Sequence, residues 1–399
     1  MKSYTDHHPF FRLRTVLLPV FLLFLTPASA GRAFPAEAPD ESFHAMVISD
    51  LHFTTNKNAS DVIISGMGYA EEITDIILAE VMAASPDVFI MTGDNTNGGG
   101  PDDVKALVSK LKKVKDAGIR LVITTGNHDF NNMTPEDYEK AYFGLIDADE
   151  RDENSLSYVV DTGDVVLLAM DDQAVEPGGG GYFSRPTMDW LRDMLKKYRE
   201  RRIILLSHHS ILLGTGSSDS ANYQIQNVDL AGLLEHYGVR LVITGHFHAQ
   251  IILEENGMHE IVSGMPLGGS HLMGTLKIDG DHLSYRAAPI DFDAYGASDM
   301  AAILREKDVR NAELEKETFR AVVAKSGLPE VTQEKILDLV VRFLTYYTDG
   351  TLGDHLEEVK NDPVCDDMIE ALWDYNYGPW MKSVLDNPPL SATELEFDF

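Results

Sequence analysis

The chain has 399 residues, of which 44% are hydrophobic and 24% charged, so its composition is that of a folded globular protein. Its 64 acidic and 33 basic residues give a formal net charge of -31, which disfavours a nuclease that acts on long nucleic acids. The only cysteine, Cys365, excludes an intramolecular disulfide and a thiolate metal cluster.

Residues 1–30 have the pattern of a secretory signal peptide. Basic residues precede the apolar run 16–25, and Ala28-Ser29-Ala30 supplies a cleavage site. Since a membrane span needs about 20 apolar residues, this run is short for an anchor, although an uncleaved anchor is the alternative. We therefore expect an exported protein, periplasmic or secreted, that has no stable membrane span after cleavage. Residues 31–43 are expected to form a leader.

From about residue 44 the chain alternates short apolar runs with longer amphipathic ones, which predicts βαβ units and an α/β fold. The strands expected on this pattern are 45–49, 88–92, 119–124, 157–160, 165–170, 203–207 and 239–244. The helices expected among them are 69–84, 101–116, 184–198 and 228–237. Asn256-Gly257 and Asp279-Gly280 then predict antiparallel hairpins, because these pairs adopt the tight turns that hairpins need.

The pattern changes near residues 293–299, where the strand signals stop. Helical periodicity follows in 300–325, 332–346 and 366–375. We therefore expect one domain over 44–295 and an all-α C-terminal domain over 299–390. The last residues, 391–399, are expected to form an acidic tail.

Five short polar motifs follow predicted strands, the position at which open α/β sheets place their ligands. They are Asp50-Leu51-His52, Gly93-Asp94-Asn95, Gly126-Asn127-His128-Asp129, His208-His209 and Gly245-His246-Phe247-His248. One motif alone means little, because Asp6-His7-His8 in the predicted signal peptide repeats the first pattern. Five motifs in order, each after an apolar strand, predict one shared site.

The side chains of these motifs suit divalent metal ions, because imidazole and carboxylate groups are ligands of Mn, Fe and Zn. In an extended segment, Asp50 and His52 point to the same side and can reach one ion. The same argument applies to His246 and His248. A carboxylate can bridge two ions, and Asp94 is the natural candidate for that role.

The ordered motifs resemble those of the calcineurin-like metallophosphoesterase superfamily over about residues 44–290. Within it, the segment from Asp50 to Asp129 and the helical C-terminal extension resemble bacterial cyclic-nucleotide phosphodiesterase-type members. The resemblance implies an αββα fold, in which helices flank a β-sandwich, followed by a small all-α domain. It also implies a centre of two divalent metal ions, which would be Mn, Fe or Zn.

The resemblance assigns roles to the motif residues. The ligands implied for the first metal are Asp50, His52, Asp94 and His248. The ligands implied for the second metal are Asp94, Asn127, His208 and His246. His128 would be the catalytic histidine that faces the leaving group, and Asp129 would orient or tune it. Since every motif precedes Asp291, removal of 299–399 is expected to leave the ligands in place.

Three more residues are candidates for contact with the substrate. Asn95 and Asn97 follow Asp94, where they either touch the substrate or form a turn. His208 and His209 are adjacent, so only one of them can point to the metal from an extended segment. We expect the ligand to be His208, nearest the strand end, and His209 to lie near the substrate.

The resemblance implies hydrolysis of a small phosphodiester such as a cyclic nucleotide. The acidic net charge makes a nucleic-acid polymer an unexpected partner. Two cations about 3.5–4 Å apart would clamp the phosphoryl group and generate a bridging hydroxide. His128 would donate a proton to the departing alkoxide. The alternatives are a phosphomonoesterase or nucleotidase that scavenges phosphate, and a non-enzymatic scaffold that acts through the helical domain.

Overall fold

A computed structural model of the chain describes residues 42–61, 64–173, 180–212, 224–225, 230–375, 377–388 and 392–399. The signal peptide expected at 1–30 and most of the leader expected at 31–43 lie outside these ranges. Ser42 and Phe43, the last residues of the expected leader, belong to the first strand, β1 (Ser42–Ile48). Within the described ranges, no helix combines the length and the apolar character that a membrane crossing requires.

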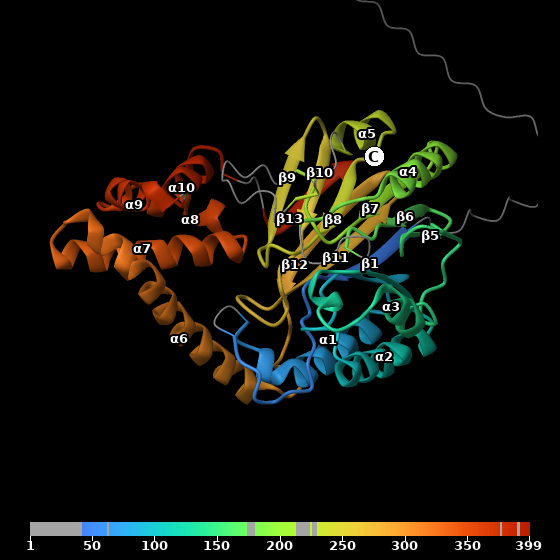
Figure 1. Cartoon of the computed structure of the whole chain (residues 1–399), viewed down its shortest axis with the longest axis horizontal. Coiled ribbons are helices and arrows are strands. Elements are labelled where there is room, and N and C mark those ends of the chain that lie inside the picture. The colour runs from blue at the N-terminus through green and yellow to red at the C-terminus, as the bar shows by residue number, and fades with distance from the viewer. Residues whose placement is uncertain are drawn as a thin grey trace, which may run out of the picture. The chain divides into compact units, whose positions relative to one another are not determined.

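Two β-sheets form the centre of the fold (Figure 1). In the described part of the chain, the first sheet has six strands in the order β13-β12-β11-β1-β2-β3. Besides β1, its strands are β2 (Val88–Thr92), β3 (Arg120–Thr124), β11 (Leu272–Asp279), β12 (His282–Pro289) and β13 (Glu394–Asp398). Strands β1, β2 and β3 run parallel, whereas β11, β12 and β13 are antiparallel to their neighbours.

The second sheet has seven strands among the described residues, in the order β4-β5-β6-β7-β8-β10-β9. They are β4 (Glu150–Arg151), β5 (Tyr158–Asp161), β6 (Val165–Ala169), β7 (Arg202–Leu206), β8 (Leu241–Thr244), β9 (Ile251–Glu255) and β10 (Met258–Val262). Strands β6, β7, β8 and β10 run parallel. The hairpins expected at Asn256-Gly257 and Asp279-Gly280 are confirmed, because they join β9 to β10 and β11 to β12.

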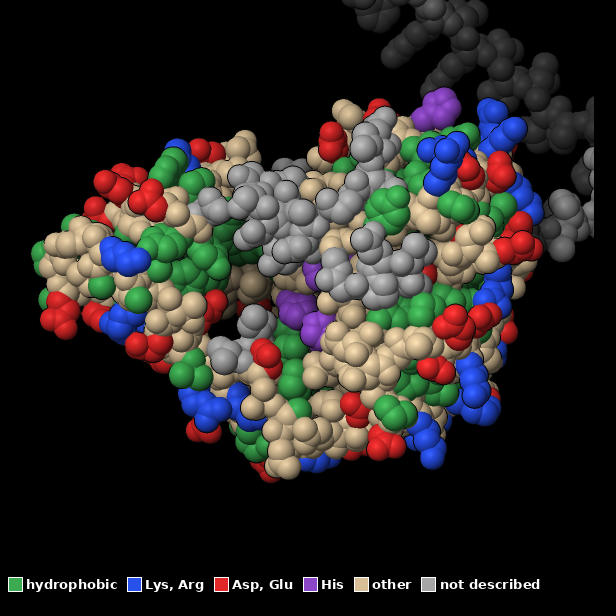
Figure 2. Space-filling model, in the orientation of Figure 1, with side chains coloured by type: hydrophobic (Ala, Val, Ile, Leu, Met, Phe, Trp, Pro, Cys, Tyr) green, Lys and Arg blue, Asp and Glu red, His purple; other side chains and the backbone are tan. Residues whose placement is uncertain are grey.

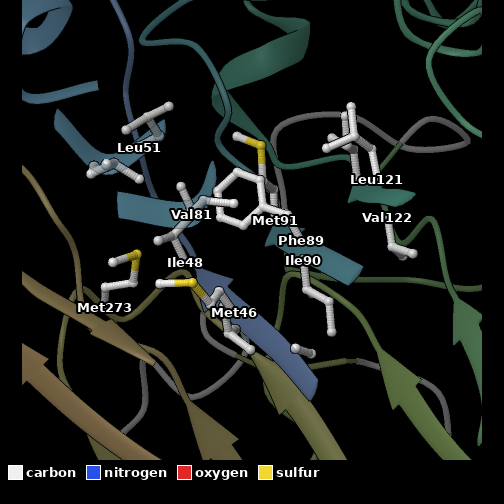
Figure 3. Close-up of a cluster of buried hydrophobic side chains, with 14 of the residues drawn as sticks. Met46, Ile48, Leu51, Val81, Phe89, Ile90, Met91, Leu121, Val122 and Met273 are labelled. Carbon is white, nitrogen blue, oxygen red and sulfur yellow. The ribbon is translucent and has the colours of Figure 1, made fainter. Parts of the chain in front are cut away.

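The parallel strands are apolar on both faces, because both faces of their sheets are covered. Figure 3 shows this in the first sheet, where Phe89 and Leu121 point to one face and Ile90 and Val122 to the other. All four side chains are buried. This double burial explains why the strands are continuous apolar runs in the sequence, and why their ends could be predicted closely.

Helices cover the outer face of each sheet. The helices of this part are α1 (Ala70–Ala84), α2 (Pro101–Asp116), α3 (Pro135–Tyr142), α4 (Arg185–Lys197) and α5 (Leu230–His236). Ile77 of α1 and Leu111 of α2 are buried with the first sheet, and Leu191 of α4 and Leu234 of α5 with the second. In Figure 1, α1 and α2 lie below the sheets and α4 and α5 above them. The expected αββα fold is confirmed.

Between β12 and β13 the described elements are helices, as expected. The helices are α6 (Ser298–Val323), α7 (Glu330–Thr348), α8 (Leu352–Lys360), α9 (Cys365–Ala371) and α10 (Tyr377–Asp386). They share an apolar core that buries Phe319 of α6 and Phe343 of α7. Near its start, by contrast, α6 buries Ala301 and Leu304 in the core of the sheets. Helix α6 therefore connects two cores, and contacts join the chain after Asp40 into one compact unit.

The C-terminal residues differ from the acidic tail expected at 391–399. Glu394–Asp398 form β13, which pairs with β12 and so returns the chain to the first sheet. The Phe397 ring stacks on His259 of β10 with centroids 4.6 Å apart, and the Arg240 guanidinium lies 4.9 Å from the same ring. Leu395 and Phe397 are half-buried while their acidic neighbours are exposed, so this strand contacts both sheets.

Phe397→Ala should lower the free energy of unfolding by about 1–2 kcal/mol, because it removes a half-buried ring and its contacts with His259 and Arg240. Thermal unfolding measures this loss. Glu396→Ala, on the exposed side of the same strand, is the matched control and should change stability by less than about 0.5 kcal/mol. An unchanged Tm for Phe397→Ala would show that β13 does not stabilise the fold.

Candidate metal centre

The five motifs meet at one edge of the two sheets, where the parallel strands end. Thr92, the last residue of β2, connects the sheets at this edge. Its Oγ1 donates to the Thr244 carbonyl at 3.4 Å, and its own carbonyl accepts from His208 Nδ1 at 2.9 Å. Figure 2 shows histidine side chains that gather in a hollow of the face it draws. The structure therefore brings together residues from loops far apart in the chain.

The backbone of the candidate ligands is left-handed at several positions. The φ angles are 53° at Asp50, 43° at His52, 48° at Asp94, 66° at His246 and 53° at His248. A residue with a side chain adopts this conformation rarely, at a cost of about 1–3 kcal/mol, and only where its surroundings impose it. The D-x-H and H-x-H segments are therefore not extended, which differs from the expectation. Asp50 and His52 still belong to one cluster, whereas His246 and His248 belong to different clusters.

Two motif glycines allow the ligand loops to approach one another. A Cβ atom at Gly93, whose φ is 94°, would overlap the His208 ring. A Cβ atom at Gly245 would overlap Ser49 Oγ and Asp50 Oδ2. Any side chain at either position would therefore push a candidate ligand loop of one sheet away from that of the other.

Four candidate ligands form a first cluster, in which one donor atom of each lies within 4.8 Å of the others. They are Asp50, His52, Asp94 and His248, the set expected for the first metal. His52 Nε2 lies 2.9 Å from His248 Nε2, which in turn lies 3.4 Å from Asp50 Oδ1. Imidazole nitrogens and carboxylate oxygens that converge in this way can hold a transition metal.

A second cluster contains Asp94, His208 and His246, with Asn127 beside it. His208 Nε2 lies 3.4 Å from Asp94 Oδ2, 3.1 Å from Asn127 Oδ1 and 3.3 Å from His246 Nδ1. Asp94 Oδ2 also lies 3.6 Å from His52 Nε2 of the first cluster. One carboxylate oxygen therefore lies between the two clusters, where a bridging ligand would be.

The hydrogen bonding and the protonation of the donor atoms fit a site for two cations. Asp94 Oδ2 is buried and accepts no hydrogen bond from the described residues. Burial lowers the pKa of His52 to about 4 and the pKa of His246 to about 3, so both rings are neutral at pH 7, the form that binds metal. Burial alone would also lower the pKa of His208, but Asp94 raises it to about 10. A metal ion would replace that proton, so the clusters are consistent with a binuclear centre.

His128 lies beside the first cluster but is held differently. Its Nδ1 donates to the Asn97 carbonyl at 3.0 Å, and its backbone N–H donates to Asp94 Oδ1 at 2.7 Å. Its ring meets the His52 ring edge-on, with centroids 4.6 Å apart. The described residues give Nε2 no hydrogen bond, so this atom can exchange a proton with a substrate. Asn97, expected near the substrate, orients His128 through its carbonyl.

The Asp129 carboxylate contacts the loops and not the His128 ring, among the described residues. It accepts from Asn95 Nδ2 at 2.9 Å, from the Thr96 N–H at 3.0 Å and from the Gly126 N–H at 3.2 Å. It therefore ties the loop after β2 to the loop after β3, and orients His128 only through the backbone. Burial and the nearby Asp94 charge raise the pKa of Asp129 to about 6.

Asn95 belongs to the same buried network. Its Nδ2 donates to the Thr124 carbonyl at 2.9 Å as well as to Asp129, and the residue is fully buried. Asn95 is therefore part of the buried network at the site, and the substrate contact considered for it stays a prediction. Its Nδ2 joins two ligand loops, while its buried Oδ1 accepts no hydrogen bond from the described residues.

His208 and His209 point to different places. His208 Nε2 belongs to the second cluster, as expected. His209 is fully buried, its ring centroid lies 4.0 Å from that of His246, and its Nδ1 lies 3.3 Å from Asp172 Oδ1. His209 thus packs against a candidate ligand, and the position near the substrate expected for it stays a prediction.

Asp172 is a candidate that the sequence analysis missed. This fully buried carboxylate accepts the backbone N–H groups of His208 at 3.2 Å and of His209 at 2.8 Å. The preceding Asp171 accepts from Thr125 Oγ1 at 2.5 Å, beside the loop after β3. A signal was present, because Asp171-Asp172 follows the apolar strand β6 just as the motifs follow theirs. No histidine accompanies this pair of aspartates, so the pattern does not identify it as a site motif.

Comparison with known proteins agrees with this site. The family model of the calcineurin-like phosphoesterases matches residues 43–250. A probable glycerophosphodiester phosphodiesterase, GpdQ, of Arcobacter nitrofigilis is 30% identical over 166 residues, which are 41% of this chain and 57% of that protein. A probable cyclic nucleotide phosphodiesterase of Rhodococcus erythropolis is 25% identical over 217 residues, which are 53% of this chain and 67% of that protein.

The chain thus spans a little over half the length of the first of these relatives. A solved structure, a dimetal phosphatase from Danio rerio, has the same fold with a TM-score of 0.51. The match covers 61% of this chain and 95% of that one at 14% sequence identity, so it supports the fold alone.

Asp172→Ala should weaken metal binding and destabilise the protein, because the buried N–H groups of His208 and His209 lose their acceptor. Such a loss costs about 1–3 kcal/mol for each unsatisfied group, and removal of a residue that orients ligands lowers metal affinity about 10–100-fold. Metal content after dialysis against graded chelator measures the affinity. Asp189→Ala on α4, whose carboxylate is exposed, is the control. Wild-type metal retention by Asp172→Ala would contradict this role.

Proposed function

Because the chain belongs to the calcineurin-like phosphoesterase family, we propose that it is an exported phosphodiesterase that cleaves a small, cyclic-nucleotide-like phosphodiester with two divalent metal ions. Family membership makes it a metal-dependent phosphoesterase. The observation that carries the proposal is the convergence of the expected ligand set around Asp94 Oδ2, with His128 beside it. The relatives named above as phosphodiesterases support the diester as substrate.

In this proposal the two clusters hold one ion each and share Asp94. The residues that would hold the first ion are Asp50, His52, Asp94 and His248. The residues that would hold the second are Asp94, Asn127, His208 and His246. When bound, the ions supply Lewis acidity towards phosphoryl oxygens and a nucleophile from water near neutral pH. Nitrogen and oxygen donors without thiolate favour Mn, Fe or Zn.

His128 would supply the proton that the leaving alkoxide needs. Its Nδ1–H bond to the Asn97 carbonyl can persist in both the charged and the neutral ring. Nε2 can therefore gain and lose a proton while the ring keeps its orientation. The backbone bond from His128 to Asp94 Oδ1 holds this atom next to the two clusters.

Two parts of the proposal, export and a small ester as substrate, are supported by the sequence. The signal-peptide pattern of residues 1–30 supports a periplasmic or secreted enzyme. A formal net charge of -31 favours a small ester over a nucleic-acid polymer, because cations at the site can reverse the field only locally. The scaffold alternative has no support from a site in which the expected ligand residues converge.

The Mn-loaded enzyme should hydrolyse bis-p-nitrophenyl phosphate with a kcat/KM about tenfold or more above that for p-nitrophenyl phosphate, a difference of about 1.4 kcal/mol in transition-state stabilisation. The two esters share a leaving group and differ in their charge and second substituent. The assay is then extended to cyclic nucleotides and glycerophosphodiesters. A preference for the monoester would support a phosphomonoesterase instead, and metal-loaded enzyme inactive on both would refute the proposal.

His128→Ala should lower kcat for an alkyl phosphodiester by about 10²–10⁴-fold, because the alkoxide loses its proton donor. The loss should be smaller for p-nitrophenyl esters, whose leaving group departs as a stable anion. Metal content should stay at the wild-type value, since His128 Nδ1 is bound to a backbone carbonyl. His236→Ala, which alters an exposed histidine, is the control. A wild-type rate on the alkyl ester would show that another group donates the proton.

A further inference from the structure

The ligand loop after β8 packs directly against the helical domain. Phe247 lies between His246 and His248, and its ring packs against the apolar core of the helices. The Phe247 and Tyr347 ring centroids lie 6.0 Å apart in an edge-to-face arrangement of 80°. Tyr347, near the end of α7, is itself buried in that core. A residue between two candidate metal ligands thus contacts the helical domain, whose described residues supply none of the candidate ligands.

Backbone contacts continue this interface along the chain. The Gln250 N–H donates to the Thr348 carbonyl at 2.8 Å, and Ala249 is fully buried in the helical core. The turn after α7 approaches the same segment closely, since a Cβ atom at Gly350 would lie 2.9 Å from the Gln250 carbonyl oxygen. The φ of Gly350 is 74°, which glycine adopts without strain. Residues 247–250 and 347–350 therefore form one interface.

The segment 347–350 also binds a second loop at the edge of the sheets where the candidate ligands lie. Asp349 Oδ1 accepts from the Ser270 N–H at 3.1 Å, in the loop after β10. Gln250 Oε1 accepts from the Gly264 N–H at 3.2 Å, which links that loop to the ligand loop. The segment 347–350 therefore fixes two neighbouring loops beside the metal ligands at once.

The ligand loop needs such support because its backbone is strained. His246 and His248 both have positive φ, a conformation that persists only where surrounding groups impose it. From the side of the sheets, Asp50 Oδ2 accepts the His246 N–H at 2.9 Å. From the other side, the Phe247 ring packs edge-to-face against Tyr347, so the residue between the two ligands is in contact with the helical core.

We propose that the end of α7, residues 347–350, is a positioning element of the metal centre, and that Phe247 is the residue through which it acts. The helical domain would then hold the loop that provides one ligand to each ion. This inference rests on the proposed metal centre and is independent of the substrate. It replaces the expectation that residues 299–399 can be removed without effect on the ligands.

The test is the apparent dissociation constant for Mn of the full-length protein, measured by competition with a chelator. Phe247→Ala should weaken binding about 10–100-fold, the range for residues that orient metal ligands. Phe319→Ala is the matched control, because Phe319 is buried in the same core against Tyr377, with a centroid distance of 5.1 Å. It should lower Tm at least as much as Phe247→Ala does and leave the metal affinity unchanged.

Variants of Tyr347 test the same contact from the helical side. Tyr347→Leu should weaken metal binding as Phe247→Ala does, whereas Tyr347→Phe keeps the ring and should retain wild-type affinity. In the double variant Phe247→Ala with Tyr347→Leu, the two losses of metal affinity should not add, because each substitution removes the same contact between the two rings. If Phe247→Ala does not fold, Tyr347→Leu and Phe319→Ala decide the question alone.

Three results would overturn the inference: wild-type metal affinity in Phe247→Ala and Tyr347→Leu, an equal loss of affinity in Phe319→Ala, or additive losses in the double variant. Failure of the proposed function looks different, because wild-type protein would then bind no metal or bind metal without hydrolysing phosphate esters. The two failures are therefore distinguished by the wild-type measurements.

Discussion

The buried Asp94 carboxylate is the constraint on which the rest of the site depends. Its Oδ2 lies near the Nε2 atoms of His52 and His208, at 3.6 and 3.4 Å, and its Oδ1 accepts the His128 N–H. A carboxylate away from water is stable only with charged or hydrogen-bonding partners on all sides. The fold must therefore bring loops of both sheets within a few ångströms of one side chain. That requirement accounts for the glycines before the ligands and for the contact between the sheets at Thr92.

Other buried carboxylates hold the loops around Asp94. Asp129 accepts backbone N–H groups of the loops after β2 and β3, and Asp172 accepts those of His208 and His209. The oxygens of both carboxylates accept hydrogen bonds from the protein itself. The ligand side chains are therefore oriented before an ion or a substrate binds. Preorganisation of this kind lowers the cost of assembling charged groups at a reacting phosphate.

The parts that the sequence predicted well are those determined by local pattern. The strands of the parallel sheets are apolar runs because both of their faces are buried, and the ligand motifs follow them because loops at strand ends form the site. Non-local contacts escaped prediction. Asn95 and His209 have polar side chains beside ligands, yet both are buried by partners from distant loops. Helix α3 was missed because it has only 8 residues, too few for a clear period.

The C-terminal hundred residues show the same limit at the level of domains. A change of pattern near 293–299 marks a real change of secondary structure, and contacts cross it in both directions. Helix α6 is buried in both apolar cores, the end of α7 contacts the ligand loop, and β13 completes the first sheet. Acidic residues dominate the charge of β13, whereas its half-buried side chains are the two apolar ones between them. Periodicity can reveal which side chains of a segment are buried, but it cannot reveal which distant segment covers them.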